Sequence, residues 1–287
     1  MTSTRRARRR PAVGLALVLV AALTGCAPQG PSPSDSAAAA RVPRFDHIVI
    51  VVEENKARSQ VEGMPFLSGL ARGGATFSDF RAETHPSQPN YLALWSGSLQ
   101  GVDSDRCPVD LGDQPSLGSQ LLAAGRSVSI YSEGLPRPGY TGCASGRYVR
   151  KHNPLADFRA TSGAKHNLPF RAFPTNFADL PSVSMVVPNL DHDMHDGSVS
   201  AGDTWLAAHL SAYRDWAPAH NSLLIVTFDE DDGTSPNRIL TTIYGANVRP
   251  GVYGETVDHY RLLHTVEAAS RLGLIGAAGA PITDVWK

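Results

Sequence analysis

Charged residues are scarce in this chain, and a surplus of basic charge is absent. Only 18% of the 287 residues are Asp, Glu, Lys or Arg, while 42% are hydrophobic, which excludes an intrinsically disordered chain. The chain has 26 basic and 27 acidic residues, and five of the basic residues are arginines within positions 1–25. The rest of the chain is therefore acidic, which argues against a general nucleic-acid-binding protein.

No hydrophobic run is long enough to span a bilayer comfortably. The apolar run 11–23 follows an arginine-rich start, as in a secretory signal peptide. It leads into Leu-Thr-Gly-Cys at positions 23–26, which resembles the lipobox of bacterial lipoproteins. We therefore expect a lipoprotein-type signal peptide over residues 1–25, a lipid on Cys26, and an exported protein that is either anchored to the outer face of the cell membrane or secreted. An ordinary cleaved signal with an incidental cysteine is the alternative.

Beyond Cys26 the chain contains only two cysteines, Cys107 and Cys143. In the oxidising compartment that an exported protein meets, two cysteines usually form a disulfide, so we expect this pair to be linked. A metal site with two thiolates is the alternative, although neither cysteine belongs to a Cys-x-x-Cys motif. Pro, Ser, Gly and Ala dominate the stretch before the first strand-like segment, which predicts a flexible linker over 26–44 and a folded domain over 45–287.

Strand-like and helix-like segments alternate through this domain, and no internal repeat is visible. The β-branched run 47–52 is typical of a strand that is covered on both faces. Alternation of this kind predicts an α/β fold with a mainly parallel sheet and helices on both faces. The expected strands are 47–52, 127–131, 182–187, 223–228 and 241–244, and the expected helices are 65–72, 90–95, 117–124, 203–216 and 259–272.

Acidic and imidazole side chains follow three of the expected strands. Glu53-Glu54-Asn55, residues 229–233 and the segment 188–196 each come directly after one of them. Parallel strands end at the same edge of a sheet, where ligands bind, so we expect these groups to converge. Crowded carboxylates repel one another unless a cation neutralises them, which predicts a divalent metal: oxygen ligands suit Ca²⁺, Mg²⁺ or Mn²⁺, and added histidine makes Zn²⁺ or Fe reasonable. Solvated acidic turns are the alternative.

A serine stands just before one of the expected helices, in Thr-His-Pro-Ser-Gln-Pro-Asn-Tyr at positions 84–91. A phosphate at this point would meet free backbone N–H groups and the positive end of the helix dipole. Close to a metal, the hydroxyl of Ser87 would be an activated nucleophile. A helix cap is the alternative interpretation of this serine.

The Ser-x-Pro-Asn pattern, followed by a short helix and Ser-Gly, resembles the nucleophile segment of the alkaline-phosphatase-like phosphohydrolases. Together with Glu54-Asn55, an Asp-Glu pair after a late strand, and the helix motif His-Tyr-x-Leu-Leu-x-Thr-x-Glu at 259–267, it resembles the bacterial phosphoesterase family. That family contains phospholipases C and AcpA-type acid phosphatases. The segments 103–108 and 188–196 resemble most closely its SapM-type secreted acid phosphatases, and the resemblance runs from about residue 45 to 287.

The resemblance implies a set of site residues. Glu54 is preferred to Glu53 as the first metal ligand because Glu54 directly precedes Asn55. Phospholipases C of the family tend to carry Arg-Ser or His-Ser after the Glu-Asn pair, and Lys56-Ala57 here departs from that pattern. The implied metal ligands are Glu54, Asn55, Ser87, Asp229 and Glu230, and the implied catalytic residues are Ser87, as nucleophile, with His85, Asn90, His192 and His195.

The resulting hypothesis is an acid-phosphatase-type phosphomonoesterase that forms a phosphoserine on Ser87. Its substrates would be phosphorylated small molecules or phosphoinositides, and nucleic acid would not be a partner. Asn90 would donate its amide to a phosphate oxygen, and His192 or His195 would protonate the leaving alcohol or bind the metal. Two alternatives stay open: a phosphodiesterase of phospholipase C type, and a lipid-tethered protein that binds phosphate or metal without turnover.

Overall fold

The computed structural model describes residues 1–3, 32–234 and 236–287. Cys26 and nearly all of the expected signal peptide lie outside the described residues. Helix α1 (Pro33–Ala39) falls within the expected linker, and the chain that follows it is anchored because Val42 and Phe45 are buried in the core. Among the described residues no helix is both long and apolar enough to cross a membrane.

One large sheet, ordered β11-β2-β10-β8-β1-β7-β3-β6, forms the centre of the domain. The short β9 pairs with the last two residues of β2. Most neighbouring pairs are parallel, as expected, whereas β10 runs antiparallel to both β8 and β2. The strands are β1 (His47–Glu53), β2 (Ala75–Arg81), β3 (Val128–Ser132), β6 (Asn167–Pro169), β7 (Val183–Val187), β8 (Ser222–Phe228), β9 (Arg238–Ile239), β10 (Thr242–Gly245) and β11 (Gly251–Val257), with a separate hairpin of β4 (Ala144–Ser145) and β5 (Tyr148–Val149).

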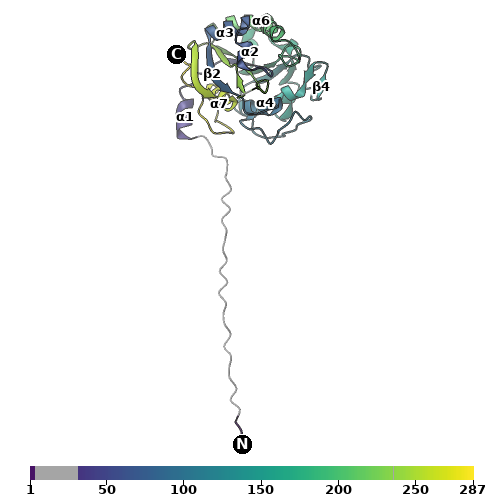
Figure 1. The fold of residues 1–287 in the computed structure, drawn as a ribbon, viewed down its shortest axis with the longest axis vertical. Coiled ribbons are helices and arrows are strands. Elements are labelled where there is room, and N and C mark those ends of the chain that lie inside the picture. Colours follow the sequence, from purple (N-terminus) through teal and green to yellow (C-terminus); the bar gives the residue numbers. More distant parts are fainter. Residues whose placement is uncertain (4–31, 235) are drawn as a thin grey trace.

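Helices cover both faces of this sheet (Figure 1). Helices α3 and α6 pack together on one face, and α4 packs against α7 and α5 on the other. The central strand β1 is buried on both faces from Ile48 onward, which explains its continuous run of β-branched residues. The helices are α2 (Arg58–Val61), α3 (Pro65–Gly73), α4 (Ser87–Ser96), α5 (Leu117–Ala123), α6 (Val199–Trp216) and α7 (His259–Ala269).

The expected α/β architecture is confirmed, and the differences from it are local. Helix α4 begins at Ser87, three residues before the expected start, and α6 begins after its N-cap Ser198, whose hydroxyl accepts a hydrogen bond from the backbone N–H of Ala201. Strands β2 and β11 were not expected. Strand β2 alternates small, polar and aromatic residues and lies beside the antiparallel β10, so its sequence lacks the long apolar run of a central parallel strand.

The expected disulfide is present between Cys107 and Cys143, whose Cα atoms lie 5.7 Å apart. It joins the segment that follows α4 to the segment that precedes the β4–β5 hairpin. Arg150 strengthens the same connection, because its guanidinium donates to the backbone carbonyl groups of Val109 and Thr141 and pairs with the buried Asp157. Two loops that are distant in sequence are thus fixed side by side.

Glu267 on α7 is a buried carboxyl outside the disulfide loops, and we predict that it makes stability depend on pH. Burial raises its pKa from 4.5 to about 9, so the folded state keeps the proton. Because the unfolded chain loses that proton near pH 4.5, the free energy of unfolding should fall as pH rises from about 5 to 9. Glu267→Gln should remove this slope and stabilise the protein near pH 7 by about 3 kcal/mol.

Urea unfolding at pH 5 and pH 8 measures this effect. Glu62→Gln is the matched control, because it removes the same charge from a side chain that is 52% exposed and pairs only across the surface with Arg58. An unchanged pH slope in Glu267→Gln contradicts the prediction.

Candidate active site

The first part of the site is formed where β1 ends. Glu53 closes the strand, and the next two residues, Glu54 and Asn55, carry their side chains to the carboxyl edge of the sheet. Asn55 has a φ of 51°, a left-handed conformation that asparagine tolerates better than most residues. This bend brings the Asn55 amide to 2.9 Å from Glu54 Oε2 and 3.5 Å from Ser87 Oγ, to both of which it donates.

The second part follows the neighbouring parallel strand β8. Asp229 and Glu230 come directly after Phe228, which lies opposite Glu53 in the register of the two strands. One carboxylate oxygen of Asp229 accepts hydrogen bonds from the backbone N–H groups of Asn55 (3.0 Å) and Glu230 (2.7 Å). The other oxygen, Oδ2, is buried and has no hydrogen-bond partner among the described residues. The two strand ends therefore hold one shared carboxylate with a free oxygen.

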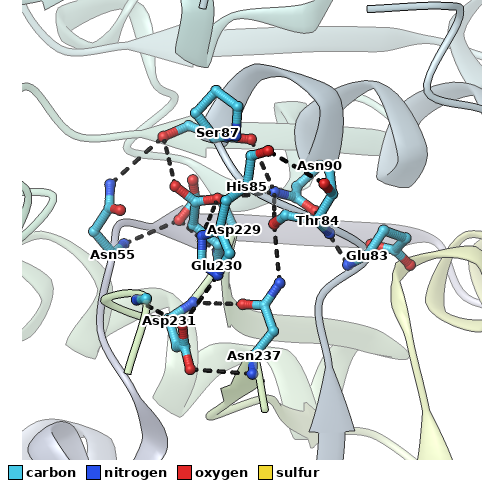
Figure 2. Close-up of polar contacts among 12 residues, drawn as sticks. Asn55, Glu83, Thr84, His85, Ser87, Asn90, Asp229, Glu230, Asp231 and Asn237 are labelled. Atoms are coloured by element: carbon cyan, nitrogen blue, oxygen red, sulfur yellow. Dashed lines mark hydrogen bonds and ion pairs between the residues drawn. The ribbon is translucent and has the colours of Figure 1, made fainter. Parts of the chain in front are cut away.

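Ser87 is brought to these carboxylates by β2 and the first turn of α4. Its hydroxyl donates to Glu54 Oε2 at 3.1 Å. It also lies 3.4 Å from Glu230 Oε1 (Figure 2). The helix cap is Pro86, and the Ser87 side chain makes no capping hydrogen bond. The hydroxyl is therefore directed at the acidic cluster and not at the helix backbone.

The segment between β2 and Ser87 is held in place by two amides. The Asn90 side chain accepts from the N–H groups of Glu83 and Thr84 and donates to the carbonyl groups of Thr84 and Pro86 and to Glu230 Oε2. Asn90 is buried, and these bonds fix the loop that leads to Ser87. Asn237 braces the same loop from the other side, since its amide donates to the Thr84 carbonyl (Figure 2).

His85 lies at the open side of the cluster. Its Nδ1 is 2.8 Å from Glu230 Oε2 and its Nε2 is 3.2 Å from Asp231 Oδ1, and 43% of its side chain is exposed. A histidine that is bound on both nitrogens but still reaches solvent can exchange protons with a substrate.

The two histidines of the 188–196 segment differ in position. His195 is 31% exposed, bonds Asp196 through Nδ1 and has its ring centre 6.0 Å from that of His152. The imidazole of His192 points elsewhere: its Nδ1 contacts Glu133 and its ring stacks on Trp205 of α6. Of the two, His195 lies beside the acidic cluster.

His152 is a site residue that the sequence analysis missed. It is buried, with Nε2 3.1 Å from Glu54 Oε1 and Nδ1 3.3 Å from Asp193 Oδ2, and its ring stacks on Tyr91 of α4. The Tyr91 hydroxyl donates to the same Glu54 oxygen at 2.6 Å. His152 belongs to the 3₁₀ helix η1 (Arg150–His152), whose sequence carries no strand-end signal, so only the three-dimensional arrangement identifies it.

The cluster is strongly acidic and shielded from water. Burial, with the neighbouring Asp229 and Asp193, raises the pKa of Glu54 well above its ordinary value. Burial likewise raises the pKa of Asp229, and burial with the charge of Asp229 raises the pKa of Glu230 to about 8. Burial lowers the pKa of His152 to about 3, so this ring is neutral near pH 7. Without added positive charge, the carboxylates would hold protons or repel one another.

These donors fit a divalent cation that prefers oxygen ligands. Three carboxylates, an amide and a hydroxyl meet at one edge of the sheet, and the free Oδ2 of Asp229 is buried among them. Within residues 1–3, 32–234 and 236–287, no three His, Cys, Asp or Glu side chains are already arranged as a metal cage, so the donors would have to converge on the ion.

Comparison with known proteins identifies relatives of this chain. The Phosphoesterase family profile matches residues 58–273. The chain is 48% identical over 279 residues to a phosphatidylinositol-3-phosphatase of Mycobacterium tuberculosis, covering 95% of this chain and 91% of that one. It is 30% identical over 249 residues to a phosphate-repressible acid phosphatase of Penicillium chrysogenum, covering 81% of this chain but only 60% of the fungal protein.

The fold also has relatives among solved structures. A protein in the alkaline phosphatase superfamily from Vibrio parahaemolyticus superposes with a TM-score of 0.52 at 12% identity, covering 78% of this chain and 67% of that chain. At this identity the likeness concerns the fold alone, and it agrees with the alkaline-phosphatase-like architecture expected from the sequence.

Proposed function

The chain belongs to the phosphoesterase family and is a phosphoric ester hydrolase, and from this we propose that it is an exported, metal-dependent phosphomonoesterase with Ser87 as its nucleophile. One observation supports the proposal above the others: the Ser87 hydroxyl points at Glu54 and Glu230, away from its own helix backbone. A binding protein without turnover needs no hydroxyl in that position.

The proposed ligands of the divalent cation are Glu54, Asn55, Asp229, Glu230 and the Ser87 hydroxyl. When bound, the cation would favour the ionised form of Ser87 and neutralise charge on the phosphate. Asp229 presents its free Oδ2 to this position while its other oxygen stays on the backbone N–H groups of Asn55 and Glu230. The carboxylates thus have a role that explains why they are crowded and buried.

In the first proposed step, Ser87 Oγ attacks phosphorus in line with the leaving oxygen. A P–O bond forms to Ser87, the ester P–O bond breaks, and the leaving alkoxide takes a proton. The hydroxyl proton of Ser87 passes to Glu54, to which it already donates. We assign protonation of the leaving group to His85, because it is partly exposed two residues before Ser87.

In the second proposed step, water attacks the phosphoserine. A new P–O bond forms to water, the bond to Ser87 breaks, and the serine oxygen regains a proton. His195 is the second candidate for proton transfer, because it is partly exposed beside His152. The backbone N–H of Gln88, in the first turn of α4, donates to Asp105 and would stabilise negative charge on a phosphate bound in place of that carboxylate.

We propose phosphoinositides as a substrate class alongside small phosphomonoesters, because the M. tuberculosis relative is named a phosphatidylinositol-3-phosphatase. We also propose that residues 1–25 are a signal peptide, that Cys26 carries a lipid, and that the catalytic domain covers 45–287 behind a linker. An anchored enzyme would then reach phosphorylated lipids at a membrane surface or soluble esters outside the cell.

The proposal predicts that activity depends on a bound divalent cation. Enzyme stripped with a chelator should lose at least about 99% of its 4-nitrophenyl phosphate hydrolysis, since the crowded carboxylates would then reprotonate or repel the substrate. Ca²⁺, Mg²⁺, Mn²⁺ and Zn²⁺ are then added back one at a time. The ion that restores hydrolysis of 4-nitrophenyl phosphate is identified as the cofactor.

Three substrates assayed in parallel separate the competing functions: 4-nitrophenyl phosphate, bis(4-nitrophenyl) phosphate and a phosphatidylinositol phosphate in vesicles. Preference for the diester favours a phosphodiesterase. Full activity in metal-free enzyme refutes the metal-dependent mechanism.

A further inference from the structure

The proposed mechanism gives no role to Lys151, a cation beside the acidic cluster. Lys151 lies in η1, next to the buried His152, and its ammonium contacts Asp105. Its side chain is 19% exposed, and its charge acts on Glu54, Glu230 and Asp193. Burial alone would lower the pKa of Lys151, but the hydrogen bond to Asp105 and the charge of Glu54 hold it above its ordinary value, so the side chain is a cation.

The partner of Lys151 is Asp105, a carboxylate that also contacts the start of α4 beside Ser87. Asp105 Oδ2 lies 2.7 Å from Lys151 Nζ, and Asp105 Oδ1 accepts a hydrogen bond from the backbone N–H of Gln88 at 3.0 Å. Gln88 is the residue after Ser87, in the first turn of α4. One carboxylate therefore bridges a lysine ammonium and a helix N–H group beside the proposed nucleophile, which is how a phosphate group is held in many proteins.

The lysine is held by the fold more firmly than its partner. Arg150, the residue before it, is buried and bonded to Asp157 and to backbone carbonyl groups of both disulfide-linked loops. Asp105 belongs to the loop after α4, and 29% of its side chain is exposed. Its carboxylate can therefore turn to solvent while the ammonium stays in place.

We infer that Lys151 replaces its hydrogen bond to Asp105 with one to a phosphate oxygen of the substrate, and that it thereby selects phosphate monoesters over diesters. This inference rests on the proposed function. A monoester carries nearly two negative charges at neutral pH, whereas a diester carries one. An additional cation at the site therefore favours the monoester, and a charged hydrogen bond of this kind changes affinity by about ten- to a hundredfold. Lys151 is thus a specificity-determining residue.

The test compares Lys151→Met, Lys151→Arg and wild type on 4-nitrophenyl phosphate and bis(4-nitrophenyl) phosphate. For Lys151→Met we expect kcat/KM to fall about thirtyfold on the monoester and less than about threefold on the diester. Lys151→Arg should recover most of the monoester activity because it keeps the charge. Lys165→Met, at an exposed lysine, is the matched control and should change neither value. Equal losses on both substrates, or none on either, overturn the inference.

Asp105→Asn provides a second test that does not depend on the folding of the Lys151 variants. The amide keeps an oxygen for the Gln88 N–H but removes the charge that competes with phosphate, so inorganic phosphate should inhibit this variant at a severalfold lower concentration. Unchanged inhibition shows that Asp105 is only a structural brace and overturns the exchange.

If the wild-type enzyme hydrolyses neither ester, the proposed function is wrong, but the inference about Lys151 can still be tested separately. Calorimetric binding of inorganic phosphate to wild type and Lys151→Met then still tests Lys151, with weaker binding by Lys151→Met expected and equal binding refuting its role.

Discussion

Ser87→Ala should lower phosphomonoester turnover by about 10³-fold or more while leaving the protein folded. The hydroxyl lies 3.1 Å from Glu54 and 3.4 Å from Glu230, and no other serine or threonine hydroxyl is hydrogen-bonded to these two carboxylates among the described residues. The side chain takes no part in capping α4, so its removal should cost only about 1 kcal/mol of stability. Steady-state kinetics and thermal unfolding of the purified variant measure both effects.

Ser96→Ala is the matched control for this prediction. Ser96 is also a buried serine of α4, at the opposite end of the helix, and its hydroxyl donates to the Leu92 carbonyl. It should keep wild-type turnover. Acid quenching of wild-type enzyme during turnover should trap phosphate on the peptide that contains Ser87. Near-normal turnover by Ser87→Ala would instead show direct attack by water, and the covalent route would be wrong.

Asp229→Asn should abolish activity and metal binding together, yet leave the metal-free protein as stable as wild type or more so. The amide oxygen can still accept from the N–H groups of Asn55 and Glu230, so the junction of β1 and β8 is kept. In the wild type, the buried Oδ2 has no hydrogen-bond partner among the described residues and can bind a cation. In Asp229→Asn an NH₂ group takes its place, and an NH₂ group cannot bind a cation. Loss of one buried negative charge also relieves repulsion from Glu54, whose pKa Asp229 raises.

The measurements are metal content by mass spectrometry, turnover, and thermal unfolding of chelator-treated protein. Asp203→Asn is the control, because Asp203 is another buried carboxylate that accepts two backbone N–H groups, those of Phe66 and Leu67, outside the site. It should keep metal and turnover. Full metal content in Asp229→Asn would exclude Asp229 from the ligand set.

The positions of Glu54 and Asp229 could be predicted from sequence, because both residues follow strands whose carboxyl ends meet at one edge of the sheet. Glu54 and Asp229 each follow a long β-branched or apolar strand, and such strands are recognisable in sequence and run parallel in an α/β sheet. The sequence left some ambiguity between Glu53 and Glu54 as the first metal ligand, with Glu54 preferred. In the structure Glu54 contacts Ser87, whereas both oxygens of Glu53 are buried without a hydrogen-bond partner among the described residues.

Other parts of the site could not be predicted from local patterns. His152 reaches Glu54 through a short 3₁₀ helix, and Lys151 reaches the cluster in the same way, so no periodicity or strand end marks either of them. His192 was expected at the site, but packing against Trp205 and Glu133 turns its imidazole toward α6. Asn90 was expected to donate to phosphate, and in the structure its amide bonds to the backbone of the loop that precedes Ser87. Long-range contacts decide the cases of His152, Lys151 and His192, whereas Asn90 is held mainly by the loop just before it.

The placement of β2 within the sheet has a consequence for how the protein is made. Strand β2, which leads to Ser87, pairs with β10 and β11, and helix α4 packs on α7. These partners are the last strands and the last helix of the chain, so Ser87 is synthesised long before the neighbours that hold its segment. Pairings so distant in sequence form late in folding. A growing or truncated chain should therefore be unable to hydrolyse phosphate esters, and activity should first emerge when the carboxyl-terminal elements dock.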